Sequence, residues 1–315
     1  MVNLLFALFK AIRPKQWIKN IALFAAITFT GQLFNAELFL LTLRAFIIFC
    51  TVSSASYLIN DILDIKRDQL HPYKKLRPIA SGALPVYVAL LSAIFLYGFG
   101  LWLASSMQPI FFFVVSLYIL VHFLYSFIFK HYPVLDILTI ASAYVLRVLA
   151  GEAVTGFFIT VWLRLTVISL SLFLATGKRR CELTLLATQK GDVSTRTRPA
   201  LGHYTEKLMD VYTAMFANST WIAYAFYTFL EKPPTLRSRV SYFLTDFFPT
   251  SLERKWLMLT IPFVLYGIMR YMQLIYEKSG GESPEKVLLS DRPLLASVVF
   301  WGMAVIGIIY VIGRG

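Results

Sequence analysis

Three aspartates in the first quarter of the chain have the type and spacing of a cation-binding site. Asp61, Asp64 and Asp68 follow Asn60 in the pattern Asn-Asp-x-x-Asp-x-x-x-Asp, at the end of a long apolar run. Offsets of three, four and seven residues place side chains on one face of an α-helix. Like charges at this spacing repel one another, whereas Mg²⁺ takes carboxylate oxygens together with water and substrate phosphates. We therefore predict that these aspartates hold a Mg²⁺-bound diphosphate and act as its catalytic ligands, with Asn60 beside them.

A cationic segment follows the aspartates almost at once. Residues 71–82 include Lys74 and Arg77 and are stiffened by two prolines. A metal ion combined with lysine or arginine is a recurring means of holding a transferring or leaving phosphate. An isolated Asp-x-x-Asp pair more often marks a solvated helix end, and the adjacent cations are what favour a phosphate site here. Lys74 and Arg77 are therefore predicted to bind substrate.

The elements that must position these residues are strongly apolar. The chain has 58% hydrophobic and only 15% charged residues, whereas soluble domains have about a quarter charged residues. Its apolar runs suit helices that cross about 30 Å of hydrocarbon, and they are too continuous for barrel strands. We predict one all-α, polytopic membrane domain over residues 1–315. Its spans, about nine at roughly 20 residues each, are expected near residues 18–35, 38–59, 84–106, 109–129, 133–150, 159–177, 208–230, 255–276 and 293–312.

Charge predicts the orientation of these spans. Lysines and arginines concentrate at the N-terminus and in residues 60–82, 178–207 and 277–292, so these segments and the N-terminus are expected on the cytoplasmic side. The formal net charge of +13 fits this topology and attraction to anionic lipid head groups. The charges are spread over several loops without a nucleic-acid-binding motif, so no nucleic-acid partner is expected.

A basic segment is the second candidate site. Lys178, Arg179 and Arg180 precede Glu182 at the end of the sixth predicted span. Cations of this kind can hold a phosphate directly, and anchoring of the span at the membrane surface is the alternative. Adjacent positions on a helix are about 100° apart. We therefore expect one or two of the three cations to face substrate.

Isolated ionisable residues in or beside the spans are further candidates. Asp136 and Arg147 lie about three turns apart on one helical face, and such groups usually face a cavity or a partner. Asp136 is predicted to lie at a cavity mouth and to hold a sugar hydroxyl, and Arg147 to pair with Glu152. Lys15 and Lys19 are further candidate phosphate ligands, for which snorkelling anchors are the alternative. Lys130 is another candidate phosphate ligand.

Residues 60–82 resemble the first aspartate-rich motif of the UbiA superfamily of intramembrane prenyltransferases. Segments within 13–20, 130–151, 177–183 and 280–293 together resemble one branch, the decaprenyl-phosphate phosphoribosyltransferases. The resemblance implies helices around a lipid-accessible cavity, with Mg²⁺ and a diphosphate at its cytoplasmic mouth. It also implies 5-phosphoribosyl 1-diphosphate as donor, a polyprenyl phosphate as acceptor, and the bacterial plasma (inner) membrane as the location.

One departure from the superfamily pattern bears on the substrates. Most members have a second aspartate-rich motif after the sixth span, where residues 176–182 here contain the basic triplet and one glutamate. An acidic face and a basic face suit two different phosphorylated substrates. Prenyl transfer to an aromatic or other acceptor and transport of a lipid or small molecule are the alternative functions. A homo-oligomer is possible, and the isoprenoid length is left open.

Overall fold

The computed structural model describes residues 2–70, 74–187, 202–231, 255–278 and 284–312. Every regular element in these ranges is helical, which confirms the all-α prediction. Seven segments among the described residues are long and apolar enough to cross a membrane, consistent with an integral membrane protein: Ala36–Leu63 (α3), Val86–Ser105 (α5), Pro109–Phe127 (α6), Leu135–Thr155 (α7), Val161–Thr184 (in α8, Val161–Ala187), Trp256–Glu277 and Arg292–Ile312.

The remaining elements connect or extend these spans. The last two spans combine η6 (Trp256–Thr260) with α12 (Ile261–Lys278), and α14 (Arg292–Ile306) with η7 (Gly307–Ile312). The other described elements are α1 (Val2–Ala11), η1 (Pro14–Phe24), α2 (Ala25–Phe29), α4 (Ile65–Leu70), η2 (Lys74–Leu76), η3 (Phe129–His131), α10 (Glu206–Leu230) and α13 (Pro284–Ser290).

The predicted count of nine spans is not confirmed. The first predicted span, 18–35, is wrong as a continuous helix, because η1 and α2 divide it and α2 ends at Phe29. Gly31 follows with a φ of 76°, in the left-handed region that ends a helix. The predicted span 208–230 corresponds to α10, which is long but is not among the seven apolar segments.

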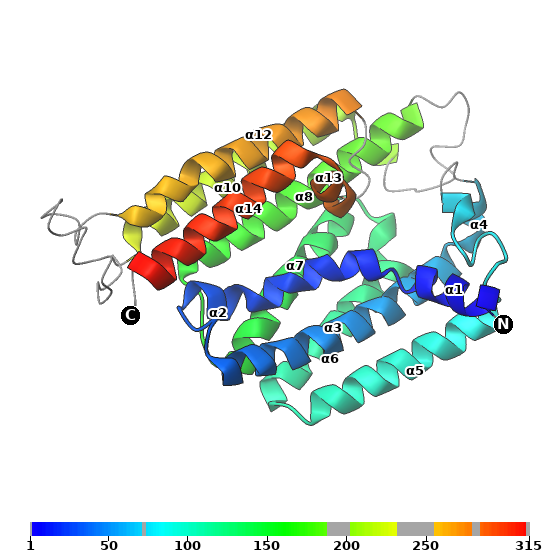
Figure 1. The fold of residues 1–315 in the computed structure, drawn as a ribbon. Helices are drawn as coiled ribbons and strands as arrows, with labels where there is room; N and C mark the ends of the chain where they lie inside the picture. Colours follow the sequence, from blue (N-terminus) through cyan, green and yellow to red (C-terminus); the bar gives the residue numbers. More distant parts are fainter. Residues whose placement is uncertain (1, 71–73, 188–201, 232–254, 279–283, 313–315) are drawn as a thin grey trace, which may run out of the picture.

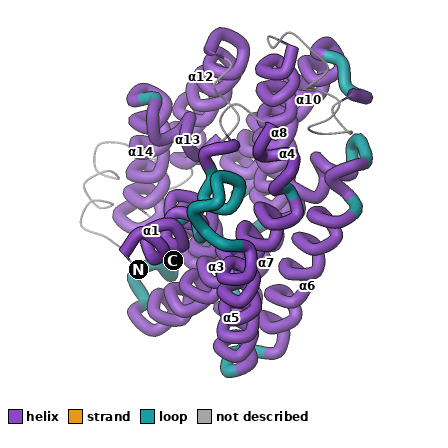
Figure 2. The backbone as a smooth tube through the Cα atoms, turned by 90° about the vertical axis from the view of Figure 1, so that its right-hand side faces the viewer, coloured by secondary structure: helices purple, strands orange, loops and turns teal. Residues whose placement is uncertain are grey.

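The helices pack in two groups. In the first group, α3 packs against α5, α6 and α7, and in the second α8 packs against α10 and α12 packs against α14. The groups meet where α7 packs against α8, and η1 lies against α3 and α7 (Figure 1). Figures 1 and 2 place α1, α4 and α13 at one end of the bundle. The site described below lies toward this end, between the two groups.

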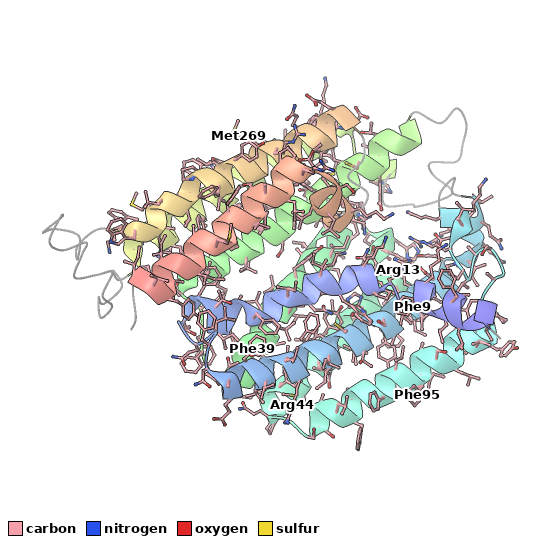
Figure 3. The ribbon with its side chains drawn as sticks, in the orientation of Figure 1. Phe9, Arg13, Phe39, Arg44, Phe95 and Met269 are labelled. Carbon is pink, nitrogen blue, oxygen red and sulfur yellow. The ribbon has the colours of Figure 1, made fainter. Side chains whose placement is uncertain are left out.

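Large apolar side chains cover the outside of the bundle. Phe95 on α5 and Met269 on α12 point away from the helix groups (Figure 3), and each is 68% exposed. Exposed apolar surface of this extent marks a membrane or protein contact. The hydrocarbon core of a bilayer supplies that contact for spanning helices.

Among the described glycines, Gly151 of α7 has the closest backbone neighbour. A Cβ atom there would lie 2.0 Å from the carbonyl oxygen of Leu23 in η1. We expect Gly151→Ala to lower the free energy of unfolding by about 1–3 kcal/mol, because the backbone of η1 must move. The apparent melting temperature in detergent measures this effect.

Gly98→Ala in α5 is the matched control, because nothing lies within 4 Å of a Cβ atom at that position. Alanine is also the better helix former. Equal melting temperatures for wild type and Gly151→Ala would contradict the close approach of η1 to α7.

Candidate active site

A cavity of about 400 Å³ lies between the two helix groups. Its wall includes residues from η1, α3, α4, α6, α7, α8 and α13. Among the predicted site residues, the wall contains Lys19, Asn60, Asp61, Asp64, Asp68, Lys74, Arg77, Lys178 and Glu182. Among the described residues, the cavity wall does not include the predicted candidates Lys15, Lys130, Asp136, Arg179 and Arg180.

Two of the three aspartates share a single cation. Arg77 Nη1 donates to Asp61 Oδ1 at 3.1 Å and to Asp68 Oδ2 at 2.6 Å. Both carboxylates are buried, with residue exposures of 2% and 5%. One guanidinium nitrogen thus bridges the carboxylates of Asp61 and Asp68.

Asp64 takes a different direction. The predicted continuous helix through the three aspartates is wrong, since α3 ends at Leu63 and α4 begins at Ile65. Asp64 is the C-cap of α3, with φ −96° and ψ 5°. Its carboxylate accepts from the buried Lys130 Nζ at 2.8 Å. Lys130, a predicted site residue, therefore contacts the acidic cluster of Asp61, Asp64 and Asp68 but is not in the cavity wall.

Arg13 completes the charge balance at Asp61. Its Nη2 donates to both carboxylate oxygens, at 2.5 and 2.8 Å. Arg13 has a φ of 55° and precedes η1, so this turn directs the N-terminal segment onto the end of α3 (Figure 3). The sequence analysis did not identify Arg13 as a site residue, because a contact between residues 48 positions apart leaves no local pattern.

The donor chemistry of the acidic cluster fits a divalent cation. No group of three metal-ligating side chains converges among the described residues, so a preformed three-aspartate cage is not observed. Mg²⁺ needs only one or two carboxylates when water and substrate phosphates complete its shell. Burial raises the pKa of the Asp68 carboxyl, as does the charge of Asp61, and Arg77 opposes both. A divalent ion at Asp61 and Asp68 would stabilise their charged forms.

The basic segment divides between cavity and core. Lys178 and Glu182 belong to the cavity wall, where Lys74 Nζ lies 3.9 Å from Glu182 Oε1. Arg179 is fully buried and pairs with Glu182 and with Asp136, whose Oδ2 is 2.6 Å from Arg179 Nε. The alternative of surface anchoring is thus wrong for Arg179.

Arg180 and Asp136 also have partners within the protein. Arg180 Nε donates to Asp210 Oδ1 at 3.1 Å, and its guanidinium lies 4.3 Å from the ring centroid of Tyr276. Asp136 has no exposed surface and accepts from Tyr204 Oη at 2.7 Å. The predicted position of Asp136 at the cavity mouth is wrong, because the carboxylate neutralises Arg179 instead.

The predicted pair of Arg147 with Glu152 is also wrong. Glu152 accepts from Arg164 Nη2 at 2.9 Å and from the backbone N–H of Ile159. Arg147 instead faces the cavity and donates to Asn20 and Tyr118. The sequence signal for this role was the isolated arginine itself, since a charge within a span usually faces a cavity or a partner.

The two predicted lysines near the first span differ in their surroundings. Lys15 is exposed, whereas Lys19 lines the cavity with its Nζ 5.8 Å from the ring centroid of Tyr144.

Residues 71–73 of the cationic segment and 280–283 of the branch resemblance lie outside the described residues. Several predicted cytoplasmic cations lie outside them as well, namely Lys190, Arg196 and Arg198.

Known proteins resemble this chain over nearly its whole length. Residues 21–290 match the UbiA prenyltransferase family. A protein of Corynebacterium glutamicum named decaprenyl-phosphate phosphoribosyltransferase is 32% identical, over 98% of this chain and 88% of its own length. The protein of that name from Mycolicibacterium smegmatis is also 32% identical, over 95% of this chain and 91% of its own.

Solved structures share the fold. A UbiA homolog from Archaeoglobus fulgidus, bound to DMAPP and Mg²⁺, has a TM-score of 0.66 and 18% identity, with coverage of 96% of this chain and 99% of that one. The same homolog bound to GPP and Mg²⁺ has a TM-score of 0.66 and 19% identity, with the same coverage. The resemblance seen at residues 60–82 is therefore confirmed, and the chain belongs to the UbiA prenyltransferase family.

Proposed function

We propose that this protein is a polyprenyl-phosphate phosphoribosyltransferase. It moves 5-phosphoribose from 5-phosphoribosyl 1-diphosphate to a polyprenyl monophosphate and releases pyrophosphate. The observation that supports this reaction most strongly is the match to two proteins named decaprenyl-phosphate phosphoribosyltransferase, at 32% identity over nearly the whole chain. The cavity adds independent support, because acidic and basic side chains both line it.

The acidic cluster is proposed to bind the donor. Asp61 and Asp68 would hold Mg²⁺, with Asp64 and Asn60 in the same wall. When bound, Mg²⁺ neutralises charge on the diphosphate and makes pyrophosphate a better leaving group. Arg77 and Lys74 lie beside these carboxylates in the wall and can donate to the phosphate oxygens.

The transfer is a substitution at the ribose C1. The bond from C1 to the pyrophosphate oxygen breaks, and its electron pair leaves with pyrophosphate. A lipid phosphate oxygen forms the new bond to C1 from the opposite face. Since the anionic phosphate is already a nucleophile, the protein has to position and neutralise the reactants, and no general base is required.

The proposed membrane placement follows from charge. The acidic cluster lies at the end of the bundle with α1 and α4, together with Lys10, Lys66, Arg67 and Lys74. Because positive residues favour the cytoplasm, we propose that this end faces the cytoplasm in a bacterial plasma membrane. A soluble phosphorylated donor can then enter from the aqueous side.

A dual-label assay tests the proposed reaction. Purified protein receives 5-phosphoribosyl 1-diphosphate labelled in ribose, with polyprenyl monophosphates of different length as acceptors. The expected products are labelled lipid and an equal amount of pyrophosphate. Labelled prenyl diphosphate with an aromatic acceptor forms the second arm. Transfer only in that arm would instead favour prenyl transfer, and no turnover in either arm would leave transport as the candidate.

The basic side of the cavity is proposed to bind the acceptor through Lys178. We expect Lys178→Ala to raise the KM for the lipid phosphate about ten- to a hundredfold, because one charge-assisted contact is lost. Steady-state kinetics with donor and acceptor varied separately measure the change. Lys207→Ala is the control, since this exposed residue is outside the cavity wall. A changed donor KM alone would assign Lys178 to the other substrate.

A further inference from the structure

Arg147 is a buried cation that pairs with no acidic residue in the described part of the chain. Only 2% of the residue is exposed, although it lies within the span α7 and contributes to the cavity wall. Among the described residues, no carboxylate forms an ion pair with it. Every other fully described arginine of the cavity wall, Arg13 and Arg77, binds an aspartate. A charge taken out of water needs compensation, so the surroundings of Arg147 call for an anion.

The hydrogen bonds of Arg147 leave part of its guanidinium available. Its Nε donates to Asn20 Oδ1 at 2.7 Å and its Nη2 to Tyr118 Oη at 2.8 Å, and its Nη1 donates to the carbonyl oxygen of Ala143. Arginine has five N–H groups, so two of them have no acceptor among the described residues. The rings of Tyr118 and Tyr144 lie within 5.0 and 5.6 Å of the guanidinium carbon, and such contacts offset only part of the lost hydration.

A second polar group at the same place lacks a partner. His122 on α6 belongs to the cavity wall, and its Nε2 atom is buried without a hydrogen-bond partner among the described residues. Its ring centroid is 4.4 Å from that of Tyr118, which binds Arg147. Two side chains from different spans thus present unsatisfied polar groups to one cavity, and a ligand with several acceptor oxygens would satisfy both.

This place is separate from the acidic cluster. The helix η1 connects the acidic cluster with the surroundings of Arg147. Arg13, which precedes η1, binds Asp61, and Asn20 within η1 binds Arg147. Seven residues of 3₁₀ helix rise about 14 Å, so the Asn20–Arg147 contact lies further along η1 than the Arg13–Asp61 contact. A ligand bound at the aspartates by its diphosphate would extend toward Arg147 with its other end.

We infer that Arg147 and His122 form a binding site for a phosphate monoester in the inner part of the cavity. The inference rests on the proposed function for the source of the phosphate, but not for the site itself. That reaction brings three phosphorylated groups together, namely the diphosphate, the 5-phosphate of the donor and the phosphate of the lipid. The aspartates and Lys178 account for two, and Arg147 can hold the third.

Binding without turnover tests the site. The probes are D-ribose 5-phosphate and farnesyl monophosphate, with ribose and farnesol as their phosphate-free counterparts, and the readout is the shift in melting temperature in detergent. At least one phosphate probe should stabilise wild type more than its counterpart does. Arg147→Gln should lower the affinity for that probe about ten- to a hundredfold. Arg164→Gln is the control, since Arg164 is another span arginine but lies outside the wall and pairs with Glu152.

His122→Leu keeps the test decisive if Arg147→Gln does not fold, because it removes no hydrogen bond among the described residues. It should weaken the same probe, and Arg147→Lys should retain part of the binding. Loss of ribose 5-phosphate binding and a raised donor KM would assign the donor's 5-phosphate. Loss of farnesyl phosphate binding and a raised acceptor KM would assign the lipid phosphate.

A purely structural role for Arg147 predicts a different pattern. Tyr118→Phe removes a hydrogen bond to Arg147 but leaves the charge. If Arg147 is purely structural, Tyr118→Phe and Arg147→Gln should lower stability alike. In both variants, the probe affinities and both KM values should then stay at wild-type levels. That result would overturn the inference. If wild type forms no phosphoribosyl lipid but a phosphate probe still binds through Arg147, the proposed function fails and the site stands.

Discussion

Asp61→Asn and Asp68→Asn should each lower kcat by about 10²–10³-fold, the scale for removing one preorganised electrostatic group. Both carboxylates contact Arg77 Nη1 and line the cavity, so each is placed to share one metal ion with the donor's diphosphate. Asparagine retains an oxygen but not the charge that Mg²⁺ requires. Asp64→Asn should have a smaller effect, because its carboxylate faces Lys130. Single-turnover release of pyrophosphate measures the chemical step.

The same experiment needs a metal titration and a matched substitution. Chelation of divalent ions should abolish pyrophosphate release, and added Mg²⁺ should restore it in wild type at lower concentration than in either variant. Asp210→Asn is the control, because this aspartate is also ion-paired but lies outside the cavity wall. Wild-type kcat and Mg²⁺ dependence in both Asp61→Asn and Asp68→Asn would rule out the proposed metal ligands.

The second large effect is expected on stability. Arg179→Met should lower the free energy of unfolding by about 3–5 kcal/mol, because it removes one partner of buried ion pairs. It leaves the carboxylates of Asp136 and Glu182 without their guanidinium, and both residues are buried. The apparent melting temperature and the folded fraction after detergent extraction measure the loss.

Lys178→Met is the comparison at the adjacent position, and it should lower the melting temperature much less, because Lys178 lies in the cavity wall and is only partly buried. The double variant Asp136→Asn with Arg179→Met should recover part of the stability, since the buried negative charge is removed too. If Arg179→Met is as stable as wild type and raises the acceptor KM, Arg179 binds substrate and its structural role is wrong.

Periodicity and composition were sufficient for the architecture because a bilayer imposes long apolar helices on any chain that crosses it. They failed at 18–35, where apolar residues continue through a 3₁₀ segment and a short helix. Hydropathy averages over a window and does not register the conformation of Gly31, whose φ is 76°.

The candidate site was predictable only where its residues are close in sequence. The acidic cluster and Arg77 fall within one segment, so their types and spacing indicated a shared cavity wall, where the structure places them. Arg13 and Arg147 find their partners Asp61, Asn20 and Tyr118 through packing of η1, α3, α6 and α7, and no local pattern encodes these pairings. Lys178 and Arg179 are neighbours that differ by about 100° around the helix, and the sequence does not reveal which side of α8 faces the core. The roles of all these residues in catalysis stay predictions.

The shared guanidinium of Arg77 makes donor binding an exchange of counter-ions. Without a divalent ion, Arg77 and Arg13 already balance the charge of Asp61 and Asp68. A divalent ion held by Asp61 and Asp68 would take over that balance and leave the guanidinium groups of Arg13 and Arg77 for an incoming anion. In the proposed reaction the metal and the diphosphate should therefore favour each other's binding, and each should bind weakly alone. The carboxylates of Asp61 and Asp68 would then become available to a metal ion, and Arg77 to a phosphate, only when both parts of the donor complex bind together.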